Sequence, residues 1–259
     1  MTNAGRFNNK IAIVTGGASG IGYAIVQRLI KEGAKVVAAD LNKDSLENMQ
    51  KELGSNFLGL EIDVTKEDQV EKLVELTVEQ FGGLNYSFNV AGASRPGQIV
   101  ELSETDWNFT VDLCLKGVFL CIKHQARQMK KQGAGAIVNV ASLNAHVPMY
   151  AGAAYSSAKA GVEMLTKNAA LELARENIRV NALLPGLVES PLTAPLVENK
   201  EIKDAYLERI PLGRAAQPDD MTGPALFLAS DDAAYVSGAS LLVDGAWAVS
   251  GYPDLSRWY

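Results

Sequence analysis

The sequence of 259 residues contains only two cysteines and only two histidines. Cys114 and Cys121 lie seven residues apart in a segment of helical composition. Two thiols at that spacing in one helix supply no disulfide framework, and they do not match the ligand spacing of a familiar zinc site. The sequence therefore predicts no metal site and fits a reducing compartment.

Basic residues and long apolar runs are also scarce. Lys and Arg number 24 against 30 Asp and Glu, giving a net charge of −6, and nucleic acids and anionic membranes both require a basic face. No apolar run approaches the ~18 residues that cross a bilayer. The opening MTNAGRFNNK lacks the apolar core of a signal peptide. We expect a soluble cytoplasmic protein with no nucleic-acid or membrane partner.

A glycine-rich stretch near the N-terminus has a chemical meaning. The β-branched run Ile11–Val14 leads into TGGASGIG at 15–22, followed by a helical pattern that ends at Gly33. Such glycines let the backbone approach a diphosphate, whose charge the helix N-terminus favours. Asp40 ends the next strand, 18 residues beyond Gly22. A carboxylate there accepts hydrogen bonds from ribose hydroxyls and repels a 2′-phosphate, which predicts NAD(H) rather than NADP(H).

Strands and helices alternate along the chain. Apolar runs predict strands at 11–14, 36–39, 56–62, 84–89, 136–141, 178–184 and 241–243. Helical patterns cover 66–81, 105–131 and 154–174. This alternation implies right-handed crossovers and a parallel sheet covered on both faces. We predict an α/β fold: a Rossmann-like doubly wound sheet in a single domain, with a cofactor half at roughly 8–140 and a catalytic and lid half at roughly 141–259.

A serine, a tyrosine and a lysine form the candidate catalytic set. Ser142 follows the strand at 136–141, and Tyr155 and Lys159 lie one turn apart on one face of the next helix. A phenol ordinarily has a pKa of about 10, and a nearby ammonium favours its deprotonated form. Tyr155 is therefore suited to exchange a proton with a substrate oxygen that Ser142 holds. The YxxxK pattern alone is common by chance, so the catalytic interpretation depends on the dinucleotide-binding motif in the same chain.

Together these motifs resemble those of the classical short-chain dehydrogenase/reductases over essentially the whole chain. The matching segments are TGGASGIG at 15–22, Asp63-Val64, Asn89-Val90-Ala91-Gly92, Ser142, YSSAK at 155–159 and Pro185-Gly186. The resemblance implies catalysis by Ser142, Tyr155 and Lys159. It implies cofactor binding by Gly16, Ser19, Gly20, Ile21, Gly22, Asp40, Leu41, Asp63, Val64, Asn89, Ala91, Gly92, Tyr155, Lys159, Pro185, Gly186 and Val188. It also implies a homotetramer, built through two long helices and the C-terminal tail.

The chain departs from the family's pattern at three positions. Val90 replaces an asparagine and Ala246 a glycine, and both changes are mild. Cys114 stands where the family has a catalytic asparagine, thought to support a proton-relay water beside Lys159. A thiol is a poor donor and acceptor, so the relay would be weakened, and losing one relay member costs ~10²-fold in rate. The alternative, slightly favoured, is that backbone groups hold the water and Cys114 is a tolerated small residue.

The loops that border the expected substrate pocket mix polar and apolar groups. The resemblance places Ser94, Asn144, His146 and Tyr150 at the substrate, beneath a lid at roughly 187–212. His146 is equally well explained as a solvated loop histidine.

The sequence predicts an NAD(H)-dependent oxidoreductase that interconverts a secondary alcohol and a ketone. Two alternatives stay open. One is a catalytically weak NAD(H)-binding sensor or scaffold, favoured only by Cys114. The other is a 3-oxoacyl thioester reductase, which Asp40 and the overall acidity disfavour.

Overall fold

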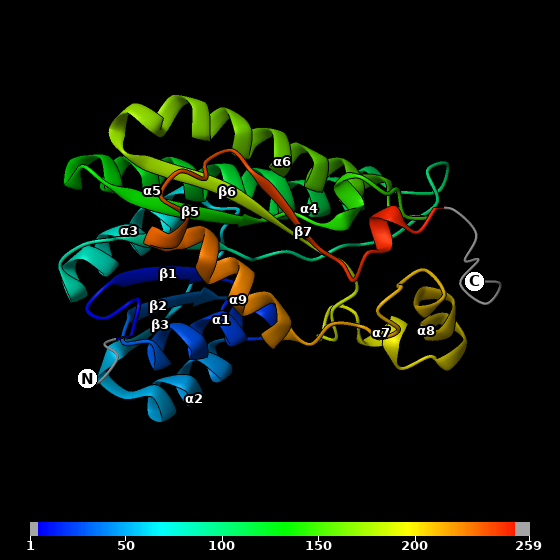
Figure 1. The fold of residues 1–259 in the computed structure, drawn as a ribbon, viewed down its shortest axis with the longest axis horizontal. Helices are drawn as coiled ribbons and strands as arrows, with labels where there is room; N and C mark the ends of the chain where they lie inside the picture. Colours follow the sequence, from blue (N-terminus) through cyan, green and yellow to red (C-terminus); the bar gives the residue numbers. More distant parts are fainter. Residues whose placement is uncertain (1–4, 252–259) are drawn as a thin grey trace.

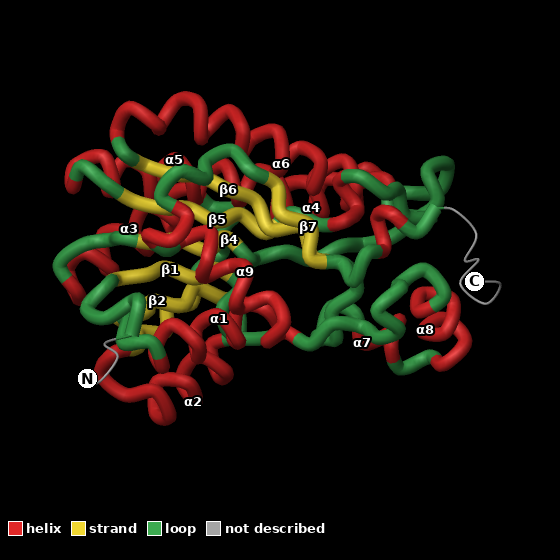
Figure 2. Tube along the Cα trace, viewed as in Figure 1, coloured by secondary structure: helices red, strands yellow, loops and turns green. Residues whose placement is uncertain are grey.

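Seven parallel strands form a single sheet in the computed structural model, which describes residues 5–251 (Figures 1 and 2). Their order across the sheet is β3-β2-β1-β4-β5-β6-β7, so the chain winds outward from β1, returns to β4 and winds outward again. The strands are β1 (Ile11–Thr15), β2 (Lys35–Asp40), β3 (Phe57–Glu61), β4 (Tyr86–Asn89), β5 (Gly135–Val140), β6 (Ile178–Pro185) and β7 (Ser240–Val243). The predicted doubly wound sheet is confirmed.

Helices cover both faces of this sheet (Figure 1). One face carries α1 (Gly20–Lys31), α2 (Lys43–Leu53) and α9 (Pro218–Ala229). The other carries α3 (Glu67–Phe81), α4 (Glu104–Val111), α5 (Gly117–Gln132) and α6 (Ala153–Leu173). Two short helices, α7 (Ala194–Val197) and α8 (Lys200–Leu207), lie apart from both layers. Single 3₁₀ turns occur at Gly54–Asn56, Leu143–Ala145, Ala174–Glu176, Asp231–Ala233 and Trp247–Val249.

Each central strand contributes side chains to both layers of the core. In β1, Ala12 and Val14 pack toward α1 and α9, whereas Ile13 packs toward α3 and α5, and all three are fully buried. Successive side chains of a strand point to opposite faces, so a strand covered on both sides has apolar residues at most of its positions. This is why the strands appear in the sequence as continuous apolar runs.

The long helix expected over 105–131 is interrupted. A π-helical turn, Asp112–Lys116, separates α4 from α5, and the amide of Gly117 donates to the carbonyl of Asp112, five residues earlier. A Cβ at Gly117 would lie 3.0 Å from Val64 Cγ2, so the helix approaches the loop after β3 closely here. The predicted helical stretch is confirmed, since residues 104–132 are helical throughout. The wide turn within it was not predicted, because hydrophobic periodicity does not register a single π turn.

The segment 190–214, which we call the lid, is closed at its base. Val188 and Ala216 form a parallel β-bridge, with Glu189 N donating to Ala216 O at 2.8 Å and Ala216 N to Leu187 O at 2.9 Å. The Glu189 carboxylate also accepts from Lys203 in the lid at 2.9 Å. The two ends of the lid therefore lie side by side at the Val188–Ala216 bridge.

Within residues 5–251, no helix combines the length and the hydropathy that a bilayer-spanning segment needs. The aromatic tail at 247–259 is expected to take part in assembly, and its residues 252–259 lie outside the described residues.

Candidate active site

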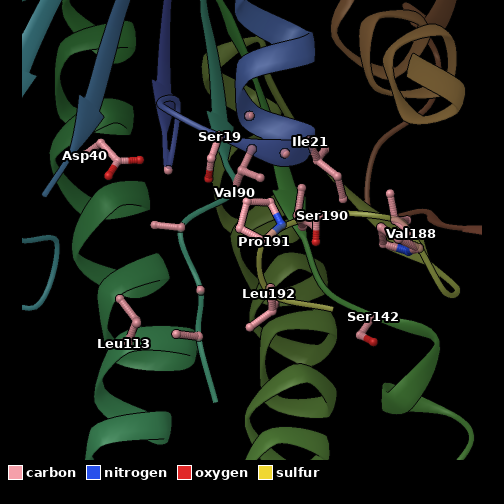
Figure 3. A pocket seen from close by; sticks show the side chains of 18 of the residues that line it. Ser19, Ile21, Asp40, Val90, Leu113, Ser142, Val188, Ser190, Pro191 and Leu192 are labelled. Carbon is pink, nitrogen blue, oxygen red and sulfur yellow. The ribbon is translucent and has the colours of Figure 1, made fainter. Parts of the chain in front are cut away.

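A cavity of about 340 Å³ opens at the carboxyl ends of the central strands, where a doubly wound sheet binds its ligands. In Figure 3, Asp40 and Ser142 stand at opposite sides of this cavity, with Ser19, Ile21 and Ser190 between them. The predicted cofactor and catalytic residues in its wall are Gly16, Ser19, Gly20, Ile21, Gly22, Asp40, Leu41, Asp63, Val64, Ala91, Gly92, Ser142, Tyr155, Lys159, Pro185, Gly186 and Val188. One cavity thus collects residues from both halves of the chain.

The glycine loop places the N-terminus of α1 against this cavity. Gly16 has φ of +64°, and a Cβ there would lie 2.8 Å from the backbone of Ala91. A Cβ at Gly22 would lie 2.0 Å from Gly16 O. Ser19 occupies the N-cap without a side-chain capping bond, and the first turn of α1 contains no acidic residue. The first amides of α1 remain available to an anion, which the helix dipole favours.

Asp40 is held in a fixed orientation at the far end of the cavity. Its Oδ2 accepts from Ala18 N of the glycine loop at 3.1 Å, and its Oδ1 accepts from Asn42 N at 3.0 Å. Each carboxylate oxygen keeps further acceptor capacity, since an ionised carboxylate has about four lone-pair sites. Asp40 therefore presents negative charge and free acceptors to whatever enters this end.

The candidate catalytic set lies together at the other end. Lys159 is only 2% exposed, its Nζ donates to Val140 O at 2.7 Å, and it lies 5.6 Å from the centroid of the Tyr155 ring. Ser142 Oγ accepts from Asn144 N at 3.1 Å and lies 3.3 Å from Asn144 Oδ1. Ser142, Tyr155 and Lys159 all line the wall of the same cavity. A phenol with a buried ammonium beside it can exchange a proton with a bound oxygen.

Cys114 lies in the π-helical turn and is fully buried. Its thiol donates to Ala93 O at 3.2 Å. A Cβ added to Gly92 would lie 3.5 Å from Cys114 Sγ and 3.6 Å from Lys159 Nζ, so the thiol and the ammonium flank the same glycine. The thiol hydrogen is directed to a backbone carbonyl in this structure.

Asn89 is absent from the cavity wall. Its amide exchanges two hydrogen bonds with Gln125, at 3.1 and 2.8 Å, and donates to Asn139 Oδ1 at 2.9 Å. Asn139 in turn donates to Thr166 Oγ1 at 2.9 Å, which links β4, α5, β5 and α6. The role of Asn89 as a direct cofactor contact stays a prediction, and its observed role is to join the layers beneath the cavity.

The four predicted substrate residues also lie outside the wall of this cavity. The Asn144 amide donates to Val147 O at 2.9 Å, and His146 Nε2 lies 2.7 Å from Glu163 Oε2. Tyr150 is 82% exposed. Their contact with a substrate stays a prediction, as it does for Ser94.

The cavity wall contains further residues that were not named individually as site residues from the sequence, although Val90 belongs to the predicted Asn89–Gly92 motif and Ser190–Thr193 to the expected lid. They are Ala39, Ile62, Val90, Ala93, Leu113, Val140, Ala141, Ser190, Pro191, Leu192 and Thr193. The Ser190–Thr193 turn lies over the glycine loop, since a Cβ at Gly20 would meet Ser190 Cβ at 3.2 Å. Thr193 Oγ1 accepts from Ser190 N at 3.1 Å and fixes this turn. The sequence signal was the position of the turn at the start of the expected lid.

Nearly the whole chain matches proteins of one family. The family model described as enoyl-(acyl carrier protein) reductase matches residues 16–247. The chain is 38% identical over 249 residues to a 2,5-dichloro-2,5-cyclohexadiene-1,4-diol dehydrogenase of Sphingobium indicum, covering 95% of this chain and 99% of that protein. The chain belongs to the classical short-chain dehydrogenase/reductase family.

Other members resemble this short-chain dehydrogenase/reductase in sequence and in structure. It is 38% identical over 250 residues to a 3-oxoacyl-(acyl-carrier-protein) reductase of Thermotoga maritima, covering 94% of this chain and all of that protein. The crystal structure of levodione reductase superposes with a TM-score of 0.90 at 31% identity, covering 95% of this chain and 100% of the other. Membership makes the chain an oxidoreductase.

Proposed function

We propose that this protein interconverts a secondary alcohol and a ketone with NAD(H). The observation that carries the proposal is the arrangement of the cavity, which has Asp40 at one side, Ser142 at the other and the glycine-loop residues Ser19 and Ile21 between them. Tyr155 and Lys159 belong to the same wall. A dinucleotide has an adenosine ribose for the Asp40 side, a diphosphate for the glycine loop and a redox-active ring for the Ser142 side. The proposal is thus supported by two groups of residues at the correct ends of one cavity.

The residues fit a dinucleotide on structural grounds. Added Cβ atoms at Gly16 and Gly22 would collide with the backbone, so the loop keeps its narrow form only with glycine. The amides of α1 would hold the diphosphate, Asp40 the adenosine ribose and Lys159 the nicotinamide ribose. When bound, the nicotinamide supplies a hydride acceptor or donor.

The proton chemistry belongs to Tyr155. In the oxidation direction the substrate hydroxyl gives its proton to the phenolate oxygen of Tyr155, and in the reduction direction the phenol returns it. The Ser142 hydroxyl donates a hydrogen bond to the substrate oxygen, for which it must give up its contact with Asn144 Oδ1, 3.3 Å away. Lys159, buried beside the ring, stabilises the negative charge on the phenolate.

Asp40 is the basis for proposing NAD(H) over NADP(H). Its carboxylate is fixed by Ala18 and Asn42, so it cannot swing away from a 2′-phosphate without losing two hydrogen bonds. Like charges brought together repel, and the phosphate would also lose solvation. Calorimetric titration is expected to show tighter binding of NAD⁺ than of NADP⁺ and a smaller difference in Asp40→Ala. Equal affinities for the unmodified protein would contradict this proposal.

The reaction is tested with a panel of secondary alcohols, sugars, polyols and hydroxysteroids, followed by NADH absorbance. Cyclohexanols begin the panel, because one relative is named for a cyclohexadiene diol. Tyr155→Phe keeps the ring but removes the exchangeable proton, so kcat should fall by ~10²-fold or more while NADH still binds. Retention of most activity would show that the base lies elsewhere.

A thioester reductase is the second candidate, favoured by the 38% identity to the 3-oxoacyl-(acyl-carrier-protein) reductase. The same Ser142, Tyr155 and Lys159 would serve it, since the reacting group is again a ketone. An acetoacetyl thioester assayed with NADPH and with NADH separates the two functions. Faster turnover of this thioester than of every alcohol or ketone in the panel would favour the second.

A further inference from the structure

The segment that follows Ser142 makes one side-chain hydrogen bond to helix α6. Among the hydrogen bonds of residues 5–251, the side chains of 143–150 make a single bond to another element, from His146 Nε2 to Glu163 Oε2 at 2.7 Å. The remaining side-chain bonds of this segment are local, from Asn144 to Val147 O at 2.9 Å and between Ser142 and Asn144. His146 therefore supplies the polar attachment of this segment to α6, in addition to the packing of buried Leu143.

The anchor at the other side is firm. Glu163 is 9% exposed, and its carboxylate accepts from three different elements. Lys167 on the same helix donates to Oε1 at 2.7 Å, Ser240 at the start of β7 donates to Oε1 at 2.9 Å, and His146 occupies Oε2. A buried carboxylate with three donors is held in one place, because leaving any of its oxygens unpaired is costly.

Glu163 lies on the helix that carries the other two catalytic groups. Tyr155, Lys159 and Glu163 are spaced four residues apart on α6, so they follow one another along the same face. A hydrogen bond to Glu163 thus fixes the serine segment relative to the tyrosine and the lysine. This connection runs beside the cavity, and neither His146 nor Glu163 lines its wall.

We propose that His146 and Glu163 form a positioning pair that holds Ser142 in register with Tyr155 and Lys159. The inference rests on the proposed function and names two residues that serve the reaction without touching the reacting atoms. Because Glu163 can only accept at Oε2, His146 must carry a proton on Nε2. Neutral and protonated imidazole both meet this requirement, so the pair does not depend on the charge of His146.

The consequence for rate follows from geometry. Ser142 has to meet a substrate oxygen at hydrogen-bond distance while Tyr155 meets the same oxygen. A displacement of ~1 Å in such an arrangement lowers the rate by up to ~10²-fold. The hydrogen bond of His146, 4 residues from Ser142, is one of several contacts that hold this segment, and the packing of buried Leu143 is another. Loss of the hydrogen bond alone should therefore lower kcat by less than that, about 10-fold.

The kinetic experiment compares His146→Ala, His146→Gln, Ser142→Ala and the double variant His146→Ala/Ser142→Ala. We expect His146→Ala to lower kcat by about 10-fold, with KM and the Kd for NADH within about twofold of the parent. Gln retains an N–H donor and should recover most of the rate. In the Ser142→Ala background, loss of His146 should have no further effect, because there is no serine left to position.

The second histidine supplies the matched control. His124 on α5 also lies beside a carboxylate, 3.1 Å from Glu67 Oε1 on α3, and does not line the cavity. His124→Ala should lower the thermal stability and leave kcat unchanged. An equal loss of kcat in His124→Ala and His146→Ala would show that losing any histidine–carboxylate contact lowers the rate, and it would overturn the proposal.

Other outcomes overturn it as well. They are a kcat of His146→Ala within about twofold of the parent, full multiplication of the two losses in the double variant, or a change confined to KM that differs between substrates. The last of these would show that His146 contacts the substrate directly.

Amide hydrogen exchange, which needs no substrate turnover, tests this inference separately from the proposed function. Amide hydrogen exchange of 143–150 should be about 10-fold faster in His146→Ala than in the parent, and unchanged in His124→Ala. If the parent turns over no substrate, the proposed function fails and the exchange experiment still decides on the tether. Unchanged exchange overturns the tether, and faster exchange in an active enzyme with unchanged kcat overturns the positioning role.

Discussion

Acidification is expected to remove a stabilising contribution that Glu163 makes to the folded protein. Burial alone would raise the pKa of this carboxyl, but hydrogen bonds from Lys167, Ser240 and His146 outweigh burial and lower the pKa from 4.5 to about 2. The deprotonated form is therefore bound more strongly in the folded state. The contribution is fully present above pH 4.5 and is lost as the pH falls toward 2.

The size of the contribution follows from the same values. Lowering the pKa from 4.5 to about 2 corresponds to roughly 3 kcal/mol, at ~1.36 kcal/mol per pH unit. The side chains of His146 and Lys167 are 40% and 46% exposed, so solvent screens their share. We therefore expect a measurable contribution of about 2 kcal/mol near neutral pH.

The assay is urea unfolding of the parent and Glu163→Gln at several pH values between 7 and ~3, at one protein concentration. The variant should be less stable by about 2 kcal/mol at pH 7, and the difference should shrink below pH ~4.5. Glu79→Gln, an exposed position on α3, is the control and should change the stability by less than ~0.5 kcal/mol. A difference that stays constant over this pH range, or is absent at pH 7, would refute the reasoning.

Cys114→Asn should change kcat only slightly, because the thiol donates to Ala93 O and is not the group that contacts Lys159. A gain approaching ~10²-fold in kcat, largest at low pH, would show instead that the thiol had broken a proton relay. Light scattering at micromolar concentration should report a tetramer, since α6 exposes Met164 and Leu171 at 58% and 79%. Leu171→Glu should reduce the assembled mass and the equally exposed Ile99→Glu should not; a monomeric parent would contradict the expected assembly.

The strands were predictable from sequence because burial on both faces makes most of their positions apolar. The glycine loop and Asp40 were predictable for a different reason, since a backbone approaching an anion and a carboxylate at a strand end each restrict the residue type. Helices α2 and α9 were not delimited. In α2, the apolar residues Leu46, Met49 and Leu53 follow helical spacing, but the segment is short and otherwise polar. In α9, Pro224 lies in the helix interior and apolar residues occur around much of its circumference, so no single apolar stripe marks it.

The parts of the site that could not be predicted depend on contacts between distant segments. Ser190 reaches the glycine loop because Thr193 fixes a turn in the lid, and no sequence spacing encodes that approach. His146 was predicted to contact the substrate because the family resemblance places its loop at the border of the substrate pocket. Its pairing with Glu163, 17 residues away, becomes visible only when the loop folds back on α6.

The parallel bridge between Val188 and Ala216 holds the two ends of the lid together, so the lid can be replaced as one segment. A loop whose two ends meet can change in length with little effect on the rest of the chain, since each doubling of length costs only ~0.6 kcal/mol of closure entropy. The sheet, the glycine loop and Asp40 lie outside this closed loop. We therefore expect that grafting a different segment between Thr193 and Ala216 would change the substrate end, while the Ser190–Thr193 turn, the glycine loop and Asp40 are kept.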